Sequence, residues 1–151
     1  MNKVFICSNN KQLLGAKVSK FSILSRHPEL EEKVEILNTD LIPVMKKIEE
    51  KEYIREGVLT SFDKKDLQSF TLLRFMPPEI MNYSGKALVI DPDVFLVKPE
   101  VNKLFEMDMS NVSILCKKGG KKGGDWASSV MILNCEKLKH WKLENFIDEL
   151  L

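Results

Sequence analysis

The sequence predicts an α/β fold with a mostly parallel central sheet. Short apolar runs alternate with stretches whose apolar residues recur at helical spacing, and polar or glycine-containing segments separate them. Residues 87–90 are all apolar, as in strands buried on both faces of a sheet. Strands that alternate with helices are typical of parallel sheets. The 151 residues suffice for a real core, so we expect a single domain at residues 1–151.

The first third of the chain predicts strand, helix and strand, followed by a charged helix. Residues 3–7 predict a buried strand, and the polar residues after it offer a helix N-cap. The next helix is expected to end near residues 27–28, because apolar residues recur at helical spacing up to that point: Leu13, Leu14, Val18, Phe21 and Leu24. Residues 34–37 predict a second strand. Apolar residues near helical period predict a charged helix at about residues 42–54, which Gly57 interrupts.

The middle of the chain predicts a helix that leads into the central strand. Asp63 is the expected N-cap of a helix that carries Arg74 and is disrupted at residues 77–78, where two prolines stand. Residues 82–86 form a polar loop before the strand at residues 87–90.

The last part of the chain predicts three helices and three further strands. We expect a short strand at residues 94–97 and a helix that starts at Pro99. Residues 112–116 and 129–133 predict strands, with Asn134 capping the helix that follows. The residues between these strands form a basic glycine-rich loop, for which a solvated loop is favoured over one that binds a diphosphate. A final amphipathic helix places three apolar residues on one side: Phe146, Ile147 and Leu150.

The most informative feature is the pair of carboxylates, Asp91 and Asp93, directly after the apolar run. In extended backbone, residues two apart point to the same side, so both carboxylates can converge on one ion while Pro92 points away and stiffens the pair. Carboxylates are rarely buried without a partner, and their hard oxygens favour Mg²⁺ or Mn²⁺. Open α/β sheets bind ligands at the carboxyl ends of their strands. The alternative is a solvated turn after a strand.

Composition and charge exclude several classes of protein. The chain is 44% hydrophobic and 30% charged, and its net charge of +1 gives no case for a nucleic-acid partner. The three cysteines have no metal-like spacing, which favours buried reduced thiols and a cytoplasmic location. The apolar run at the N-terminus is too short for a signal peptide, and no segment is long enough to span a bilayer.

Four segments occur in the order seen in one known family. These are residues 4–23, residues 69–80 with S-F-T-L-L-R-F-M-P-P-E-I, residues 85–95 with G-K-A-L-V-I-D-P-D-V-F, and residues 126–135 with W-A-S-S-V-M-I-L-N-C. In these segments the chain resembles the GT-A-fold glycosyltransferases, particularly the glycogenin-like, family-8-type enzymes that use nucleotide sugars. The resemblance implies a Rossmann-like GT-A fold with helices on both faces of the sheet. It also implies a hexosyltransferase-like activity on a nucleotide-diphosphate sugar. A UDP-sugar is the favoured donor, and the acceptor is unspecified.

The resemblance also implies a role for each matching position. Asp93 would coordinate Mn²⁺ or Mg²⁺ directly, and Asp91 would contact the metal, the ribose or the donor sugar. The metal would bridge the two phosphates of the donor. Arg74 would lie near the phosphates or the sugar, where metal and guanidinium stabilise the charge of the departing diphosphate. The remaining positions would line the base and ribose pocket or lie beside the donor sugar: Cys7, Ser8 and Asn9 for the former, Ser128 and Ser129 for the latter.

One departure from the family leaves alternatives open. The later segment of the family supplies a histidine that ligates the same metal, and neither His27 nor His140 matches that position. The chain is therefore a minimal member, a fragment, or a catalytically impaired nucleotide-sugar-binding remnant or subunit. Its oligomeric state is left open, with a homo-oligomer among the alternatives. A phosphohydrolase of the haloacid-dehalogenase type, with Asp91 as nucleophile, ranks lower. The two residues after Asp93 do not fit its usual pattern, and its motif normally stands near the start of the chain.

Overall fold

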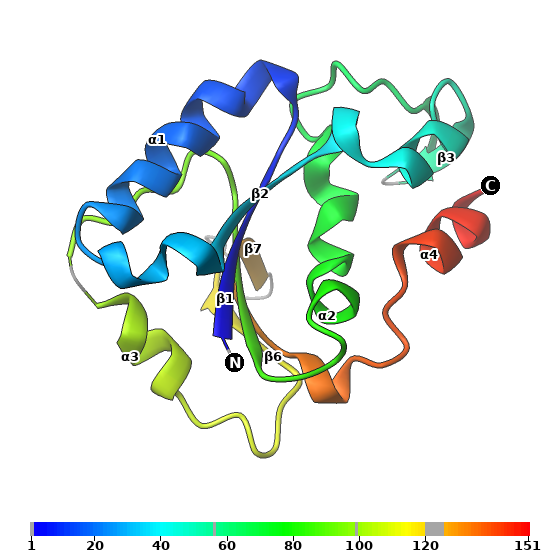
Figure 1. Cartoon of the computed structure of the whole chain (residues 1–151). Coiled ribbons are helices and arrows are strands. Elements are labelled where there is room, and N and C mark those ends of the chain that lie inside the picture. Colours follow the sequence, from blue (N-terminus) through cyan, green and yellow to red (C-terminus); the bar gives the residue numbers. More distant parts are fainter. Residues whose placement is uncertain (1, 56, 99, 120–125) are drawn as a thin grey trace.

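A five-stranded mixed sheet forms the centre of the computed structural model, which describes residues 2–55, 57–98, 100–119 and 126–151 (Figure 1). The strand order is β2 (Val34–Asn38), β1 (Asn2–Ser8), β5 (Lys86–Ile90), β7 (Trp126–Asn134) and β6 (Ile114–Lys118). β2, β1 and β5 are parallel, whereas β7 runs antiparallel to both β5 and β6. This confirms the predicted α/β fold with a mostly parallel sheet.

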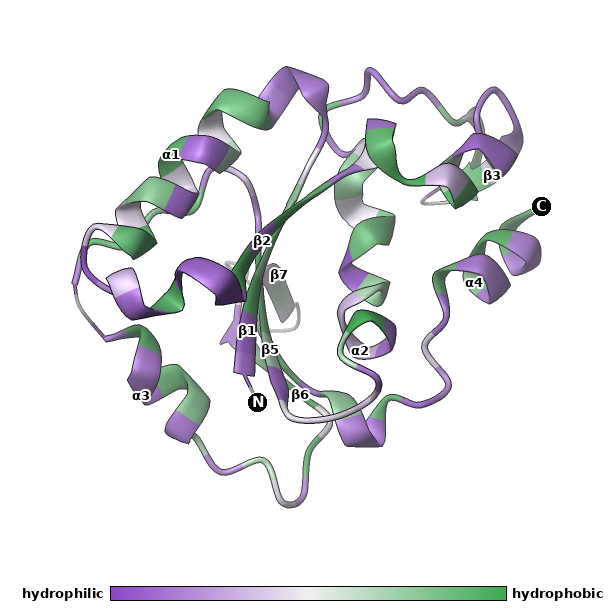
Figure 2. Cartoon of the chain, viewed as in Figure 1, coloured by the Kyte–Doolittle hydropathy of each residue, from purple (hydrophilic) through white to green (hydrophobic). Residues whose placement is uncertain are grey.

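Helices cover both faces of the sheet, because successive strand residues point to opposite faces. On one face, Ile6 and Ile90 pack under α1 (Leu13–Leu24), η2 (Pro28–Lys33) and α3 (Val101–Glu106). On the other face, Phe5 and Val89 pack under η5 (Ser69–Phe75), α2 (Pro77–Ile80) and α4 (Leu143–Leu150) (Figure 1). Figure 2 shows the hydrophobic central strands between helices that carry both hydrophilic and hydrophobic residues.

The helix α1 confirms the expected element but not the face that it buries. Leu14 is 76% exposed and Phe21 is 71% exposed, whereas Ala16, Ser19 and Ile23 are buried. Small side chains on part of the inner face let α1 lie close to the segment that follows β5, while Ile23 packs into the core and Leu14 and Phe21 face outward.

The charged helix expected at residues 42–54 is wrong. The segment forms a short 3₁₀ turn, η4 (Pro43–Lys47), and then a hairpin of β3 (Glu52–Arg55) and β4 (Val58–Ser61). Glu50 adopts a positive φ of 63°, which ends any helix there, and Gly57 occupies the hairpin turn at φ 80°. The apolar residues that suggested a helical period are divided between the core and the exposed hairpin.

The helix with Arg74 begins later than expected. Asp63 accepts a hydrogen bond from the Lys65 amide at 2.8 Å within a turn, and the helix starts at Ser69 as the 3₁₀ helix η5. The two prolines begin the separate helix α2, because proline suits the first turn of a helix.

Most of the other predicted helices and strands are confirmed, and two predictions are wrong. The loop before β5, α3, α4 and strands β6 and β7 are confirmed within one to three residues. No strand forms at residues 94–97, which the structure describes as irregular. Asn134 donates to the Met109 carbonyl at 3.4 Å and does not cap η6 (Cys135–Lys137). Pro99 and residues 120–125 of the basic loop lie outside the described residues.

Candidate functional site

The candidate site lies where the parallel strands β1, β2 and β5 end. Because these strands run in the same direction, their carboxyl ends meet at one edge of the sheet (Figure 1). β1 leads there into Asn9 and η1 (Asn10–Gln12), β2 leads into η3 (Thr39–Leu41), and β5 leads into Asp91. Ligands of open α/β sheets bind at this edge.

An ion pair connects the helix before β5 with the residue after it. One guanidinium nitrogen of Arg74 lies 2.6 Å from a carboxylate oxygen of Asp91, and each side chain is only 15% exposed. A second nitrogen of Arg74 donates to the Ser128 hydroxyl at 3.0 Å. The guanidinium also lies 5.5 Å from the ring centre of Phe70. The structure therefore brings together Arg74, Asp91 and Ser128, which come from η5, the end of β5, and β7.

Arg74 only partly offsets the cost of burying the Asp91 carboxylate. Burial raises the pKa of the Asp91 carboxyl above its usual range, Arg74 lowers it in part, and the nearby Asp93 carboxylate raises it again. Burial likewise raises the pKa of the Cys7 thiol to about 12, with Arg74 lowering it and Asp91 raising it. A further cation beside Asp91 would relieve the unfavourable burial of its charge.

Asp93 differs from Asp91 in its surroundings. Its side chain is exposed, and within the described residues no hydrogen bond or ion pair engages its carboxylate. The two aspartates belong to a turn, in which the Val94 amide donates to the Asp91 carbonyl at 3.2 Å. The Asp91 amide donates to the Ser129 carbonyl at 3.0 Å, which ties the start of the turn to β7.

These two carboxylates fit a hard divalent cation that brings further ligands with it. Among the described residues, no group of three or more acidic, histidine or cysteine side chains could enclose an ion. Mg²⁺ is often held by one or two carboxylates together with water and the phosphates of a substrate. Among the described residues no partner occupies the Asp93 carboxylate, while one oxygen of Asp91 is engaged by Arg74.

The predicted pocket residues at the end of β1 are fully buried: Cys7, Ser8 and Asn9. The Asn9 amide donates to the Asp66 carbonyl at 2.9 Å and to the Ser69 hydroxyl at 3.0 Å, and its oxygen accepts from the Gln12 amide. Its side chain thus holds the loop after β1 against η5. A role of these residues in base or ribose binding stays a prediction, as do those of Ser128 and Ser129.

Sequence analysis missed three polar residues at the same edge. Asp40 accepts a hydrogen bond from the Asn10 amide at 3.1 Å, and Asn38 donates to the Asn10 side chain at 2.8 Å. Asn10 is exposed and Asp40 is half-buried, so both remain open to a ligand. The signal was available, because Asn38 and Asp40 follow a predicted strand whose carboxyl end must share the edge with β1.

A cavity of about 140 Å³ lies beside this region, between the β3–β4 hairpin and η5. Tyr53, Arg55 and Thr71 contribute to its lining. Thr71 precedes Arg74 by three residues, and in a 3₁₀ helix such side chains lie on the same side. The cavity is therefore next to the side of η5 that carries Arg74.

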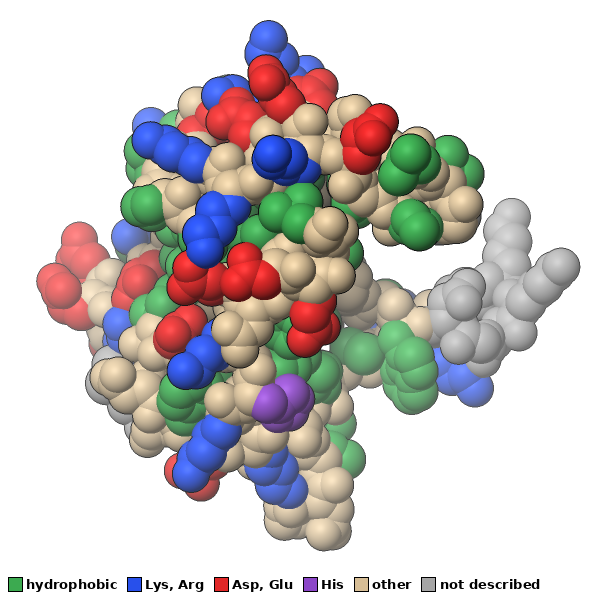
Figure 3. Space-filling view, turned by 90° about the vertical axis from the view of Figure 1, so that its right-hand side faces the viewer, with side chains coloured by type: hydrophobic (Ala, Val, Ile, Leu, Met, Phe, Trp, Pro, Cys, Tyr) green, Lys and Arg blue, Asp and Glu red, His purple; other side chains and the backbone are tan. Residues whose placement is uncertain are grey.

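The outer surface adds no strongly charged patch on the face seen in Figure 3, where acidic and basic side chains are interspersed. This agrees with the net charge of +1. None of the described helices has the length and apolar character needed to cross a membrane.

Comparison with known proteins places the fold. No family model matches the sequence, and no curated protein does. Among solved structures, galactosyltransferase LgtC in complex with donor and acceptor sugar analogs is similar at 16% identity, with a TM-score of 0.62 over 99% of this chain and 65% of that chain. Glycosyltransferase GlyE of Streptococcus pneumoniae is 20% identical, with a TM-score of 0.57 over 98% of this chain and 36% of that chain. Mouse xyloside xylosyltransferase 1 is 15% identical, with a TM-score of 0.53 over 97% and 71%.

These similarities establish the fold. The chain spans about two thirds of the length of LgtC and about a third of that of GlyE. Its α/β architecture, with the mostly parallel sheet and helices on both faces, is the GT-A type of these glycosyltransferases.

Proposed function

We propose that this chain is a metal-dependent glycosyltransferase that transfers a sugar from a nucleotide-diphosphate sugar, with a UDP-sugar as the favoured donor. The observation that carries the proposal is the pairing of the mostly buried Arg74 with Asp91 at the carboxyl edge of the sheet, beside the exposed carboxylate of Asp93. A guanidinium and two carboxylates at this edge suit a donor whose phosphates arrive with a divalent cation.

The proposed chemistry follows from the charge that develops. When the bond between the sugar and the diphosphate breaks, its electron pair stays on the diphosphate. Bound Mn²⁺ or Mg²⁺ would supply positive charge to that leaving group. Asp93 would hold the cation, while Asp91 holds Arg74 in orientation and contributes its free oxygen. Ser128 fixes the second nitrogen of Arg74, so that the guanidinium is positioned before the donor arrives.

The nucleoside end of the donor is proposed to lie over the carboxyl ends of β1 and β2. The residues from Cys7 to Asn9 form the floor, because their side chains are buried. Asn10 and Asp40 offer exposed donors and acceptors at the rim. Cys7 and Cys135 are free and buried, which supports a reducing compartment such as the cytoplasm.

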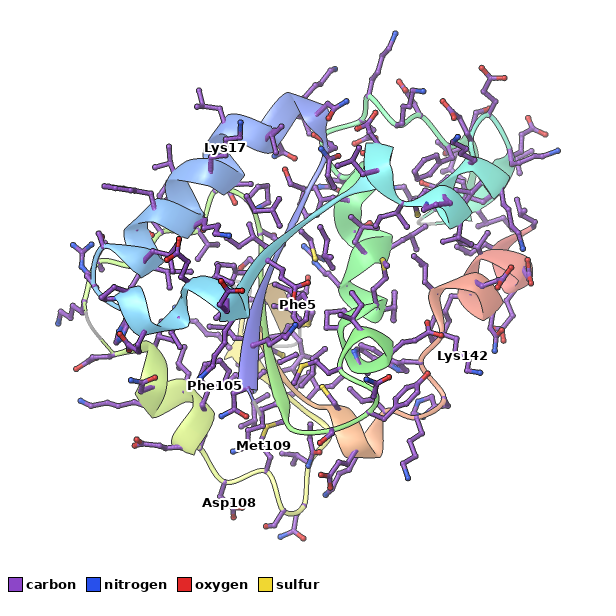
Figure 4. The ribbon with its side chains drawn as sticks, viewed as in Figure 1. Phe5, Lys17, Phe105, Asp108, Met109 and Lys142 are labelled. Carbon is purple, nitrogen blue, oxygen red and sulfur yellow. The ribbon has the colours of Figure 1, made fainter. Side chains whose placement is uncertain are left out.

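Binding of UDP and GDP with and without Mn²⁺, measured by isothermal titration and thermal shift, tests the proposal. We expect UDP binding that requires the metal and is lost in Asp93→Asn. Asp108→Asn serves as a matched control, because Asp108 is an exposed aspartate at the other end of the sheet (Figure 4). Absence of binding by any UDP- or GDP-sugar with metal would refute the proposal. Donor binding without transfer or hydrolysis would favour a nucleotide-sugar-binding remnant, and a phosphate trapped on Asp91 would favour a phosphohydrolase.

A further inference from the structure

The segment that follows β5 lies close to α1 and is hydrogen-bonded to it. Gly15 lies against the turn that holds the two aspartates: a Cβ atom at this position would stand 2.9 Å from the Pro92 carbonyl oxygen. The obstacle is backbone, which cannot rotate away as a side chain can. Glycine inside a helix is unfavourable, so its presence here has a local reason, the close approach of α1 to Pro92.

Two serines of α1 bind the backbone just beyond that turn. The buried Ser19 hydroxyl donates to the Val94 carbonyl at 2.6 Å. The Ser22 hydroxyl accepts from the Leu96 amide at 2.9 Å and donates to the Ser19 carbonyl at 2.7 Å. These bonds take the place of strand pairing, which explains why residues 94–97 form no strand.

The two carboxylates are therefore held from different sides. Asp91 is tied to β7 through its amide and to η5 through Arg74. The Asp93 side chain has no partner within the described residues, so its position depends on the backbone of the turn. Within α1, Gly15 lies against that backbone at Pro92, and Ser19 donates a hydrogen bond to it at Val94.

We propose that α1 is a positioning element for the candidate metal site: Gly15, Ser19 and Ser22 set the place of Asp93 relative to Asp91. The inference rests on the proposed function for its ligand but makes a separate structural claim. It also explains the exposure of Leu14 and Phe21, since the inner face of α1 is occupied by residues that contact the turn.

Mn²⁺ titration in the presence of UDP, followed by electron paramagnetic resonance, tests the proposal in the full chain. We expect Ser19→Ala and Gly15→Ala to weaken Mn²⁺ binding by on the order of tenfold, the range seen when groups that orient a metal ligand are removed. Ser22→Ala should also weaken Mn²⁺ binding, and Ser22→Thr should keep the wild-type affinity because it retains the hydroxyl.

Three control variants separate positioning from loss of stability. Ser25→Ala removes an exposed serine hydroxyl of the helix end that does not contact the turn. Lys17→Ala controls for the gain of alanine in α1, because Lys17 is exposed and points away from the sheet (Figure 4). Val34→Ala trims a buried side chain at the start of β2, the end of the sheet opposite the turn, so it should lower the thermal midpoint and leave Mn²⁺ affinity unchanged.

Amide chemical shifts and hydrogen exchange of Asp93 and Val94 provide a readout that does not need metal. We expect both to change in Ser19→Ala and Gly15→Ala, and to remain as in wild type in Lys17→Ala and Val34→Ala. Wild-type Mn²⁺ affinity in Ser19→Ala and Gly15→Ala would overturn the inference. If the wild-type protein binds neither Mn²⁺ nor UDP, the proposed function fails, and unchanged amides in the α1 variants would then overturn the positioning claim on its own. Should Gly15→Ala not fold, Ser19→Ala and the two Ser22 variants decide.

Discussion

Replacing Asp91 with asparagine is expected to leave the free energy of unfolding nearly unchanged, although Asp91 forms the best-buried ion pair of the candidate site. Burial raises the pKa of the Asp91 carboxyl despite its contact with Arg74 at 2.6 Å. The folded protein therefore disfavours the ionised carboxylate relative to water, because desolvation outweighs the attraction of the guanidinium. Asparagine has the same shape and keeps an oxygen for Arg74, so we expect a change within about 1 kcal/mol in either direction.

Removing the other partner should have a much larger effect. Arg74→Met keeps the apolar stem but leaves a carboxylate that is only 15% exposed without its counter-charge. Breaking a buried pair in this way typically costs about 3–5 kcal/mol, and the remaining access of water places this pair near 3 kcal/mol. In the double variant the orphaned charge is absent, so Arg74→Met with Asp91→Asn should be more stable than Arg74→Met alone.

Urea unfolding at pH 7 of the wild type, both single variants and the double variant provides the complete thermodynamic cycle. A loss above about 2 kcal/mol in Asp91→Asn would refute the reasoning, because it would show that the charged carboxylate is a net stabilising group. An Arg74→Met variant as stable as wild type would refute it equally, since the burial of the pair would then have no energetic consequence.

Three further predictions concern separate parts of the chain. Asp93→Asn should abolish Mn²⁺-dependent UDP binding yet change the free energy of unfolding by less than about 0.5 kcal/mol, because the side chain is exposed; titration and urea unfolding measure the two effects. Gly57→Ala should lower the unfolding free energy by about 1–2 kcal/mol, because φ is 80° there and an added methyl group meets nothing within 4 Å that could compensate. Burial raises the pKa of Cys7 from 9.0 to about 12 and that of Cys135 to about 11, so the unfolded thiols ionise first as pH rises above 9. Stability should then fall by up to about 1.4 kcal/mol per pH unit per thiol, and urea unfolding of Cys7→Ala between pH 8 and 11 should show a shallower decline.

The strands could be predicted because their signal is local. Residues 3–7, 34–37 and 87–90 are apolar runs of the length that a buried strand requires, and each appears in the structure within two residues of its expected bounds. The failure at residues 42–54 has the opposite cause. Met45 lies in the 3₁₀ turn η4 and Ile48 directly after it, and both are buried, whereas Ile54 is 69% exposed on the hairpin. Their helical spacing therefore does not reflect a common face.

The inner face of α1 could not be predicted from periodicity, because periodicity assumes that apolar side chains face the core. Here part of the inner face of the helix, at Gly15, Ser19 and Ser22, lies against the backbone after β5, with its carbonyl and amide groups. Glycine and serine suit that surface better than leucine does, since they permit close approach and supply hydroxyls for polar backbone groups. Recognising this from the sequence would have required knowing that residues 92–96 pass under residues 15–22, and the chain separation of more than seventy residues hides that contact.

The candidate site shows where a sequence motif stops being informative. The pattern Asp-x-Asp treats its two carboxylates as equivalent, and their place after a buried strand was enough to locate them at the edge of the sheet. The fold makes them unequal: Asp91 is mostly buried and paired with a cation of the protein, whereas Asp93 is exposed and unpaired within the described residues. This difference arises from Arg74 and Ser128, which stand 17 residues before and 37 residues after Asp91 in the chain.

If the two aspartates shared one role, asparagine at either position should have the same consequence. Because they do not share their surroundings, Asp93→Asn should remove ligand binding alone, whereas Asp91→Ala, which removes the oxygen that Arg74 contacts, should also release the guanidinium that the pair holds in place.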